Sequence, residues 1–229
     1  MAIILYDLVG ADDRRFSPFC WRARMALAHK GLDFETRPTR FTEIGRIADG
    51  SQNRVPVIED GAQMVADSWT IAEHLETAYP QRPSLFGDTG GKHLARFVKH
   101  WVEAIVQPAI ITLVVKDVYD RVLPEDKDYF RRSREGRFGK SLEDVQSGRD
   151  ERRAALSRAL TPLRLLLQEQ PFIGGEGPLF ADYITFGALQ WPRVASPFRL
   201  VNDDDPIAAW FERCLDLHGG VGRAMPAAA

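Results

Sequence analysis

Strand-like and helix-like patterns alternate through the first eighty residues of the chain. Residues 3–8 are apolar and β-prone, and after a polar loop the pattern predicts a helix from residue 18 to about residue 30. Pro18 suits the first helical turn because its missing N–H would have no partner there, and Gly31 stands where a left-handed C-terminal cap is expected. One apolar stripe of this helix should pack on a sheet, whereas Arg22, Arg24 and Lys30 are expected to point elsewhere.

The next segment predicts three more strands and a second helix. Residues 33–37 alternate as a strand, and residues 57–59 and 63–65 flank Asp60 and Gly61, a dipeptide typical of hairpin turns. A helix is expected over residues 68–78. The order is therefore β-α-β followed by β-β-α.

A linker composition separates this unit from a helical remainder. Residues 81–91 include Pro83 and three glycines. Helices are expected near residues 93–118, 149–170 and 181–191. The charged segment 123–148 is interpreted as an ordered excursion or a mobile loop. We expect two domains, residues 1–82 and an all-α domain at residues 91–229.

Charge and cysteine content narrow the functional classes. The chain has 30 basic and 32 acidic residues, a formal charge of −2, which favours neither nucleic acid nor anionic membranes as partners. The apolar run 104–115 is interrupted by Gln107 and Pro108 and is too short for a bilayer span, so we interpret it as a buried helix. Without a signal-peptide pattern, and with only Cys20 and Cys214, we expect a soluble cytoplasmic protein without disulfides or metal.

Ser17 is the first candidate for chemistry. Its hydroxyl immediately precedes a predicted helix, where unpaired backbone N–H groups and the positive end of the helix dipole converge and would stabilise a thiolate. Taken alone, Ser17 is more simply an N-cap, which contributes about 1 kcal/mol.

Two further features are compatible with a bound peptide. Pro56 follows Val55 at the entry to a predicted strand, and a cis bond there would turn the backbone of Val55 outward to pair with an extended ligand. Asp67 and Ser68 open a helix whose amides and hydroxyl suit a carboxylate, while the acid suits an ammonium group. Each has a simpler interpretation, an ordinary trans-proline and a helix cap.

In combination, these residues resemble the cytosolic glutathione transferase family over nearly the whole chain. The resemblance implies an α/β thioredoxin-like N-terminal domain plus an all-α C-terminal domain, a homodimer, and glutathione as co-substrate. It also implies that Ser17 donates a hydrogen bond to the glutathione sulfur and that Val55, beside cis-Pro56, pairs with the cysteinyl backbone. Asp67 and Ser68 would then hold the γ-glutamyl end.

Arg54 is assigned, on the same resemblance, to the glycyl carboxylate of glutathione. Asp182 resembles the structural capping aspartate of the family's second domain, although Leu179 stands where the family has a hydroxyl.

A narrower similarity is to bacterial lignin β-etherases, which cleave β-aryl ethers with glutathione. Five stretches carry it: 17–22, 67–73, 123–126, 141–146 and 180–183. The implied reaction is attack of the glutathione thiolate on an electrophilic, aromatic substrate. Candidate liners of the electrophile site are Phe16, Trp101, Tyr119, Tyr129 and Trp191, of which the tryptophans also fit core positions.

Other interpretations of the same scaffold stay open. They are a glutathione-dependent isomerase or reductase and a non-catalytic module of the same fold that binds ligands or partners. Cys20 is expected to pack inward rather than act as a redox thiol. The basic run at residues 131–134 is expected to form a solvated face.

Overall fold

The computed structural model describes residues 2–48 and 50–228, and its first unit is built on a four-stranded mixed sheet. The strand order is β2-β1-β3-β4, with β1 and β2 parallel and the remaining pairs antiparallel. A parallel pair needs a crossover, and α1 supplies it. The bounds are β1 (Ile3–Leu8), α1 (Pro18–His29), β2 (Phe34–Thr39), β3 (Val57–Asp60), β4 (Gln63–Ala66) and α2 (Ser68–Ala78). These elements confirm the predicted β-α-β and β-β-α order, with Gly61 at φ 61° in the hairpin turn.

Helices fill the rest of the chain, as predicted. They surround α9, of whose sixteen residues all but Arg193 are buried, so this helix forms the centre of the second unit. The bounds are α3 (Thr89–Trp101), η3 (Val102–Val106), α4 (Gln107–Arg121), η4 (Pro124–Asp126), α5 (Lys127–Phe138), α6 (Leu142–Gln146), α7 (Arg149–Ala159), α8 (Thr161–Glu169), α9 (Phe180–Ala195) and α10 (Pro206–Gly220). Two short 3-10 turns belong to the first unit, η1 (Ala11–Asp13) and η2 (Phe41–Arg46).

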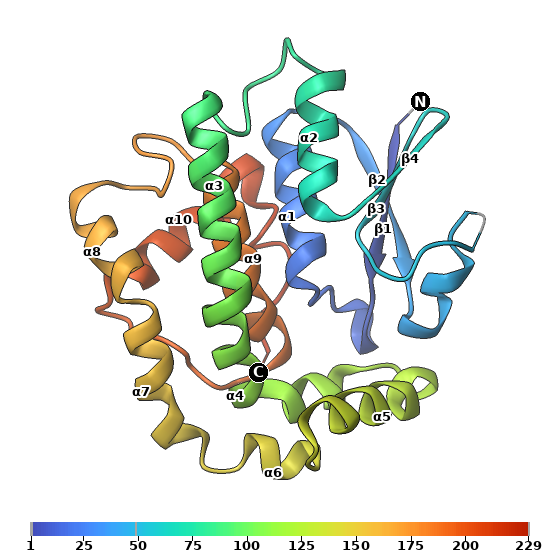
Figure 1. Cartoon of the computed structure of the whole chain (residues 1–229), viewed down its shortest axis with the longest axis vertical. Helices are drawn as coiled ribbons and strands as arrows, with labels where there is room; N and C mark the ends of the chain where they lie inside the picture. Colours follow the sequence, from blue (N-terminus) through green and yellow to red (C-terminus); the bar gives the residue numbers. More distant parts are fainter. Residues whose placement is uncertain (1, 49, 229) are drawn as a thin grey trace.

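The two units meet where α1 packs on α9 (Figure 1). A β-carbon at Gly187 of α9 would lie 2.3 Å from the carbonyl oxygen of Pro18, so only glycine permits this approach. The Trp21 and Phe186 rings meet edge-on with centroids 6.0 Å apart. The start of α1 is therefore fixed by the helical unit as well as by the sheet.

Two basic residues outside the apolar stripe are nevertheless buried, Arg22 within α1 and Lys30 immediately after it. Arg22 is fully buried and donates to Glu103 of η3 at 2.6 Å, and Lys30 pairs with Glu76 of α2 at 2.6 Å. A charge leaves water only when a partner compensates it, and both partners come from other segments. The hydrophobic pattern of α1 alone therefore could not predict these two ion pairs.

A polar chain of three rings also crosses the seam between the units. The hydroxyl of Tyr183 on α9 lies 2.6 Å from Nδ1 of His29 and 2.8 Å from Nε2 of His218. Nε2 of His29 lies 3.0 Å from the carbonyl oxygen of Ser84. Burial lowers the pKa of both histidines, that of His218 to about 4. The network therefore favours neutral imidazoles.

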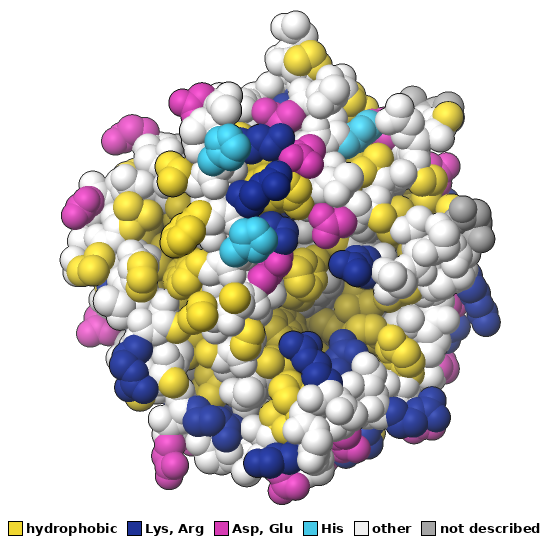
Figure 2. Space-filling model, in the orientation of Figure 1, with side chains coloured by type: hydrophobic (Ala, Val, Ile, Leu, Met, Phe, Trp, Pro, Cys, Tyr) yellow, Lys and Arg dark blue, Asp and Glu magenta, His cyan; other side chains and the backbone are white. Residues whose placement is uncertain are grey.

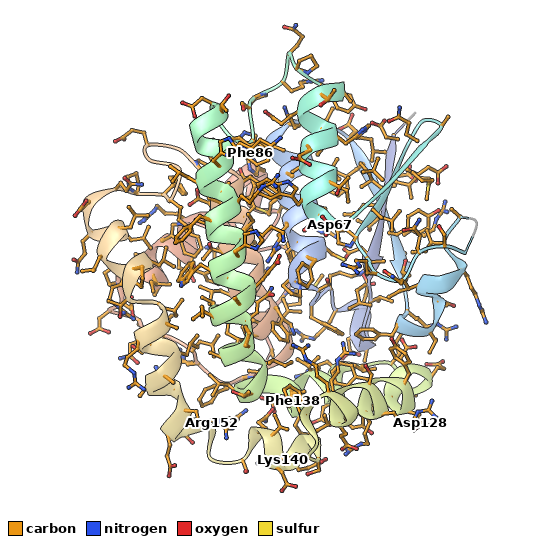
Figure 3. The ribbon with its side chains drawn as sticks, viewed as in Figure 1. Asp67, Phe86, Asp128, Phe138, Lys140 and Arg152 are labelled. Carbon is orange, nitrogen blue, oxygen red and sulfur yellow. The ribbon has the colours of Figure 1, made fainter. Side chains whose placement is uncertain are left out.

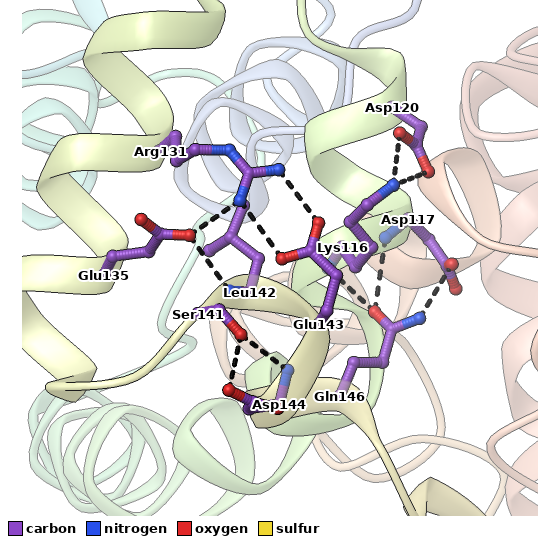
Figure 4. A network of polar contacts seen from close by, with 10 residues as sticks. All are labelled: Lys116, Asp117, Asp120, Arg131, Glu135, Ser141, Leu142, Glu143, Asp144 and Gln146. Atoms are coloured by element: carbon purple, nitrogen blue, oxygen red, sulfur yellow. Dashed lines mark hydrogen bonds and ion pairs between the residues drawn. The ribbon is translucent and has the colours of Figure 1, made fainter.

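The charged segment 123–148 is an ordered helical excursion rather than a mobile loop (Figure 4). Ser141 caps α6, and the side chain of Gln146 accepts from the backbone N–H groups of Lys116 and Asp117 in α4. Arg131 bridges α5 to α6 through Glu143. Side-chain caps and clasps of this kind hold the short helices on α4.

The helical run Thr89–Arg121 contains the stretch 104–115, which is buried at Val106, Ile110 and residues 113–115 but exposed at Ile105. By length and composition alone it could cross a membrane, since its most apolar window has a mean hydropathy of 1.4, and only 33% of that window is buried. Leu94, Phe97 and Ile105 are 69%, 71% and 50% exposed. Because spacings of three and eight residues recur on one side of a helix, these side chains form one apolar face.

Candidate functional site

A cavity of about 510 Å³ opens between the two units, beside the N-terminal end of α1. Figure 2 shows a hollow with hydrophobic walls and Lys or Arg side chains around its edge. Its volume lies within the usual range for small-molecule sites. The first unit contributes Ser17, Arg54 and Val55 to its lining, three of the six predicted site residues.

Ser17 is the N-cap of α1, and the residue also lines this cavity. Its Oγ accepts from the backbone N–H of Cys20 at 3.2 Å, and the residue is only 5% exposed. A hydroxyl has two acceptor lone pairs and one donor, so capping leaves the proton available to a ligand. The simpler interpretation and the functional one are therefore compatible, because the cap fixes the orientation in which the hydroxyl meets a thiolate.

The Val55–Pro56 peptide bond is cis, as predicted. Val55 lines the cavity, whereas Arg54 is exposed and its Nε donates to Oδ1 of Asn53 at 3.0 Å. The carbonyl oxygen of Pro56 accepts from the N–H of Asp67 at 3.1 Å. That bond ties the strand entry to the start of α2.

Asp67 and Ser68 form the N-terminus of α2, at its lower end in Figure 3. The Asp67 carboxylate accepts from the N–H groups of Trp69 and Thr70 at 2.9 and 3.2 Å. Asp67 has φ 75°, a conformation that costs a non-glycine residue about 1–3 kcal/mol. A helix cap alone does not require this conformation, and a strained backbone held by its surroundings is typical of ligand sites.

The opposite wall is aromatic and comes mainly from η2, α4 and α5. Of the five liners predicted from the sequence, three line the cavity: Phe16, Tyr129 and Trp191. The other two do not. Trp101 packs against the hydrophobic core, and Tyr119 packs on Phe130 and is covered by Arg131.

Two functional features of this wall were missed in the sequence. Phe41 of η2 packs on Phe16 and Phe130, and it is fixed by Asp126 of η4, which accepts from the N–H groups of Phe41 and Thr42 at 2.9 and 3.0 Å. In the sequence the stretch 123–126 indicates only the subgroup; in the structure its fully buried Asp126 joins η4 to η2, which carries Phe41 of the cavity lining.

Arg134 is the second missed feature. The basic run 131–134 was expected to form a solvated face, yet Arg134 is half-buried and lines the cavity together with Arg137. Among the described ion pairs, that run contributes only those of Arg131 with Glu135 and Glu143. The available partners explain the difference: Arg131 lies within ion-pair distance of Glu135 and Glu143, whereas Arg134 forms no ion pair with a carboxylate within residues 2–48 and 50–228.

The cysteines are buried, and no His, Cys, Asp or Glu cluster suited to a metal ion occurs within residues 2–48 and 50–228. Burial, and then the charge of Asp7, raise the pKa of the Cys20 thiol well above its usual value. A thiol of this kind is a poor nucleophile. As predicted, Cys20 packs inward, 1% exposed.

The buried aspartate of α9 also has the predicted capping position. The Asp182 carboxylate accepts from the N–H groups of Ile173, Gly174 and Leu179 and from Nε1 of Trp210, at 2.7 to 3.0 Å. Four donors to one carboxylate stabilise the preceding loop, so the missing hydroxyl at Leu179 is compensated.

Two family models match the chain. One, described as "Glutathione S-transferase, N-terminal domain", matches residues 13–83, and the other, "Glutathione S-transferase, C-terminal domain", matches residues 93–217. Together they include every predicted site residue.

Individual relatives are more distant. A zeta-class glutathione S-transferase of Euphorbia esula is 30% identical over 117 residues, 47% of this chain, which spans about half (50%) of that relative. A maleylacetoacetate isomerase of Pseudomonas aeruginosa is 36% identical over 76 residues, 30% of this chain and 36% of that protein.

Solved structures share the fold over nearly the full length. The crystal structure of glutathione transferase GSTFuA3 from Phanerochaete chrysosporium has a TM-score of 0.77 at 27% identity, covering 98% of this chain and 94% of its own. A glutathione S-transferase of Ceriporiopsis subvermispora, solved in complex with glutathione, has a TM-score of 0.75 at 23% identity, covering 98% and 95%. The thioredoxin-like sheet unit and helical second unit are thus the architecture of these proteins.

Proposed function

The chain belongs to the glutathione S-transferase family, and from that premise we propose that it binds glutathione along the Ser17 side of the cavity and transfers it to an aromatic electrophile. The observation that carries the proposal is the position of Ser17, which caps α1 and opens into a cavity shared with Val55 beside cis-Pro56. The positive end of the helix dipole and a donated hydroxyl both favour a thiolate there.

The reaction is a substitution at carbon. The glutathione thiol gives its proton to solvent, and the thiolate, stabilised by Ser17, attacks the electrophilic carbon. A carbon–sulfur bond forms, and the leaving group departs with the electron pair of its own bond. An acidic leaving group needs no protonation, so the site requires no general acid.

The remaining predicted residues receive the following roles in the proposal. Val55 pairs with the cysteinyl backbone of glutathione, because a cis-proline leaves its backbone groups unpaired by the sheet. Asp67 receives the γ-glutamyl ammonium, Ser68 its carboxylate, and Arg54 the glycyl carboxylate. The exposure of Arg54 makes its contribution the smallest of the four.

Within this class we propose an α-keto β-aryl ether as one substrate. The aromatic wall suits its two rings, and Gln107, which lines the cavity, has a buried Nε2 with no hydrogen-bond partner among the described residues. A buried donor left unpaired costs free energy until a ligand oxygen accepts from it. A ketone oxygen beside the attacked carbon fits this donor, and the aryloxide is an acidic leaving group.

A second candidate is a glutathione-dependent isomerisation, favoured by the relative named maleylacetoacetate isomerase. There the thiolate would add to a conjugated double bond, the carbon–carbon bond would rotate, and the carbon–sulfur bond would break again. Glutathione would be regenerated rather than consumed. A reductase that relies on a protein thiol is disfavoured, because the Cys20 thiol is buried with a raised pKa.

We also propose that the chain acts in the cytoplasm as a homodimer. The apolar face of Leu94, Phe97 and Ile105 supports the dimer, since a large exposed apolar patch is typical of an interface. Phe97→Glu should convert a dimer to a monomer in analytical ultracentrifugation. An unchanged sedimentation coefficient for this variant, or a monomeric wild type, would remove the dimer from the proposal.

The transferase proposal is tested with a substrate panel. Purified protein is incubated with glutathione and, separately, a fluorogenic α-keto β-aryl ether, an aryl chloride, a conjugated cis-enone and a mixed disulfide. We expect glutathione conjugates from the ether and the chloride. Turnover of the enone alone, with no glutathione consumed, would favour the isomerase; turnover of the disulfide alone would contradict both. The variant Gln107→Leu should lower the turnover of the ether, because the donor to its ketone oxygen is lost, and should leave the turnover of the aryl chloride unchanged.

A further inference from the structure

Two arginines of α5 line the electrophile end of the cavity without an acid to pair with. Arg134 is half-buried and Arg137 is exposed. Neither forms an ion pair with any carboxylate in residues 2–48 and 50–228, although Arg134 donates to the Ser133 hydroxyl at 3.0 Å. The Arg134 guanidinium lies over the Phe130 ring, 4.5 Å from its centroid, and 5.4 Å from that of Phe41.

The surroundings make this arrangement unusual for the helix. Three residues earlier, Arg131 donates to both Glu135 and Glu143 at 2.7 to 3.1 Å. The helix thus pairs Arg131 and leaves Arg134, which lines the cavity, without a carboxylate partner among the described residues. Burial lowers the pKa of Arg134, Tyr129 opposes that effect and the like charge of Arg137 adds to it. A bound anion would offset both the desolvation and the repulsion.

The acid that lines the cavity does not supply this charge. Glu103 accepts from Arg22 at 2.6 Å and from Lys99 at 2.8 Å. Burial alone would raise the pKa of Glu103, but these two cations outweigh it and leave the pKa below its usual value. Glu103 is therefore a carboxylate already balanced by two cations, and the aromatic end of the cavity keeps a positive charge.

We propose that Arg134, assisted by Arg137 at the mouth, binds an anionic group of the electrophile, so that the preferred substrates are aromatic carboxylates or similar arene anions. The proposal rests on the proposed transferase function and names its substrate class. A guanidinium held over an aromatic ring, 4.5 Å from its centroid, keeps its N–H donors available to a carboxylate. The substrate's ring then lies among Phe41, Phe130 and Phe138, all of which line the cavity.

The same chemistry could recognise the glycyl carboxylate of glutathione instead, and the experiment separates the two sources. The probes are 4-chloro-3,5-dinitrobenzoate and its methyl ester, which share one reacting carbon and differ in charge. Glutathione thiolate attacks the carbon that bears chlorine, a carbon–sulfur bond forms, and chloride leaves with the bonding pair. The two glutathione conjugates and glutathione alone are also titrated by calorimetry, which needs no turnover.

Arg134→Gln is expected to lower kcat/KM for the benzoate by about 10- to 100-fold, as for loss of a charged hydrogen bond, and to change the ester less than about 3-fold. The carboxylated conjugate should lose affinity by the same factor, and glutathione alone should not. Arg134→Lys should restore part of the loss, and Arg137→Gln, at an exposed position, should give a smaller loss with the same charge selectivity. The matched control is Arg132→Gln, an exposed charge on the same helix that does not line the cavity.

Three results would overturn the inference: equal losses for benzoate and ester, a loss of glutathione affinity equal to that of the conjugate, or no effect in Arg134→Gln and Arg137→Gln with wild-type circular dichroism. Failure of the transferase function is separate. In that case the protein binds the two conjugates with the predicted charge selectivity and yet turns over neither the benzoate nor its ester. That result would support the anion site and contradict the proposed catalysis.

Discussion

The two walls of the cavity are built in different ways. The Ser17 wall consists of backbone ends, the N-terminus of α1 at Ser17 and the cis bond after Val55, and the N-terminus of α2 at Asp67 is hydrogen-bonded to this wall through Pro56. The opposite wall consists of side chains from segments far apart in sequence, such as Phe41 of η2 and Phe130 of α5. A wall of backbone ends is fixed by the fold, whereas a wall of side chains changes with each substitution. The first suits an invariant co-substrate, and the second suits a substrate that sets specificity.

The largest effect is expected from a substitution that disrupts the packing of α1 on α9, the contact that joins the two units. In Gly187→Ala the new methyl would lie 2.3 Å from the Pro18 carbonyl oxygen, so α9 and the start of α1 must separate. We expect a loss of about 2–3 kcal/mol in the free energy of unfolding, measured by urea denaturation. The control is Gly136→Ala in α5, where a β-carbon meets nothing within 4 Å; it should be neutral or slightly stabilising.

The second prediction concerns the pH dependence of stability, which His218 controls at the same contact between the units. Burial depresses the pKa of His218 to about 4 in the folded protein, below the unfolded value near 6.5. The unfolded chain therefore takes up the proton first as pH falls, so stability is full above about pH 6.5 and is lost progressively toward pH 4. With a discount for partial exposure, we expect a loss of about 2 kcal/mol, seen as a falling melting temperature.

Two histidine variants sharpen that measurement. His218→Asn keeps a hydrogen-bonding side chain at φ 53°, a conformation that Asn tolerates, and should flatten the pH dependence. His93→Asn, at an exposed position of α3, should leave it as in the wild type. Equal slopes in all three proteins would mean that the ring network at the seam does not control acid stability.

The third prediction tests the backbone wall. Asp67→Asn keeps a good helix cap at a position with φ 75° and removes only the charge that the ammonium of glutathione would meet. Glutathione affinity should fall about 10-fold in calorimetric titration, while the free energy of unfolding changes by less than about 0.5 kcal/mol. Unchanged affinity would reduce Asp67 to a cap and leave the ammonium without its proposed partner.

The smallest effect is expected in the side-chain wall. Asp126→Asn weakens the clasp on the N–H groups of Phe41 and Thr42, at a cost of about 1 kcal/mol in stability. The KM for the electrophile should rise several-fold while glutathione affinity stays constant. A change in glutathione affinity of the same size would show that the walls are not independent.

The same contrast explains what the sequence could predict. The start of α1, the hairpin around Gly61 and the bounds of α2 follow from local rules for caps and turns, whereas the cis bond at Pro56 is implied only by the family resemblance. Local rules also mark Ser17 and Asp67 as helix caps, and the family resemblance then assigns them, with Arg54 and Val55, to glutathione.

The side-chain wall depends on partners that sequence distance conceals. Arg22 is buried only because Glu103, 81 residues later, accepts from it. Likewise Phe41 is fixed by Asp126, 85 residues away. Arg134 enters the cavity because α5 is an ordered helix rather than a loop. Tertiary pairing, not propensity, decides such positions.

The most direct test of the account is the pKa of the glutathione thiol in the bound state. This pKa is measured by a pH titration in which the ultraviolet absorbance reports the thiolate. Ser17→Ala should raise this pKa by about 1–2 units, because the donated hydrogen bond to sulfur is lost. Ser141→Ala, which removes the equivalent N-cap serine of α6, should leave it unchanged. A bound-thiol pKa that is the same in Ser17→Ala as in the wild type would contradict the account.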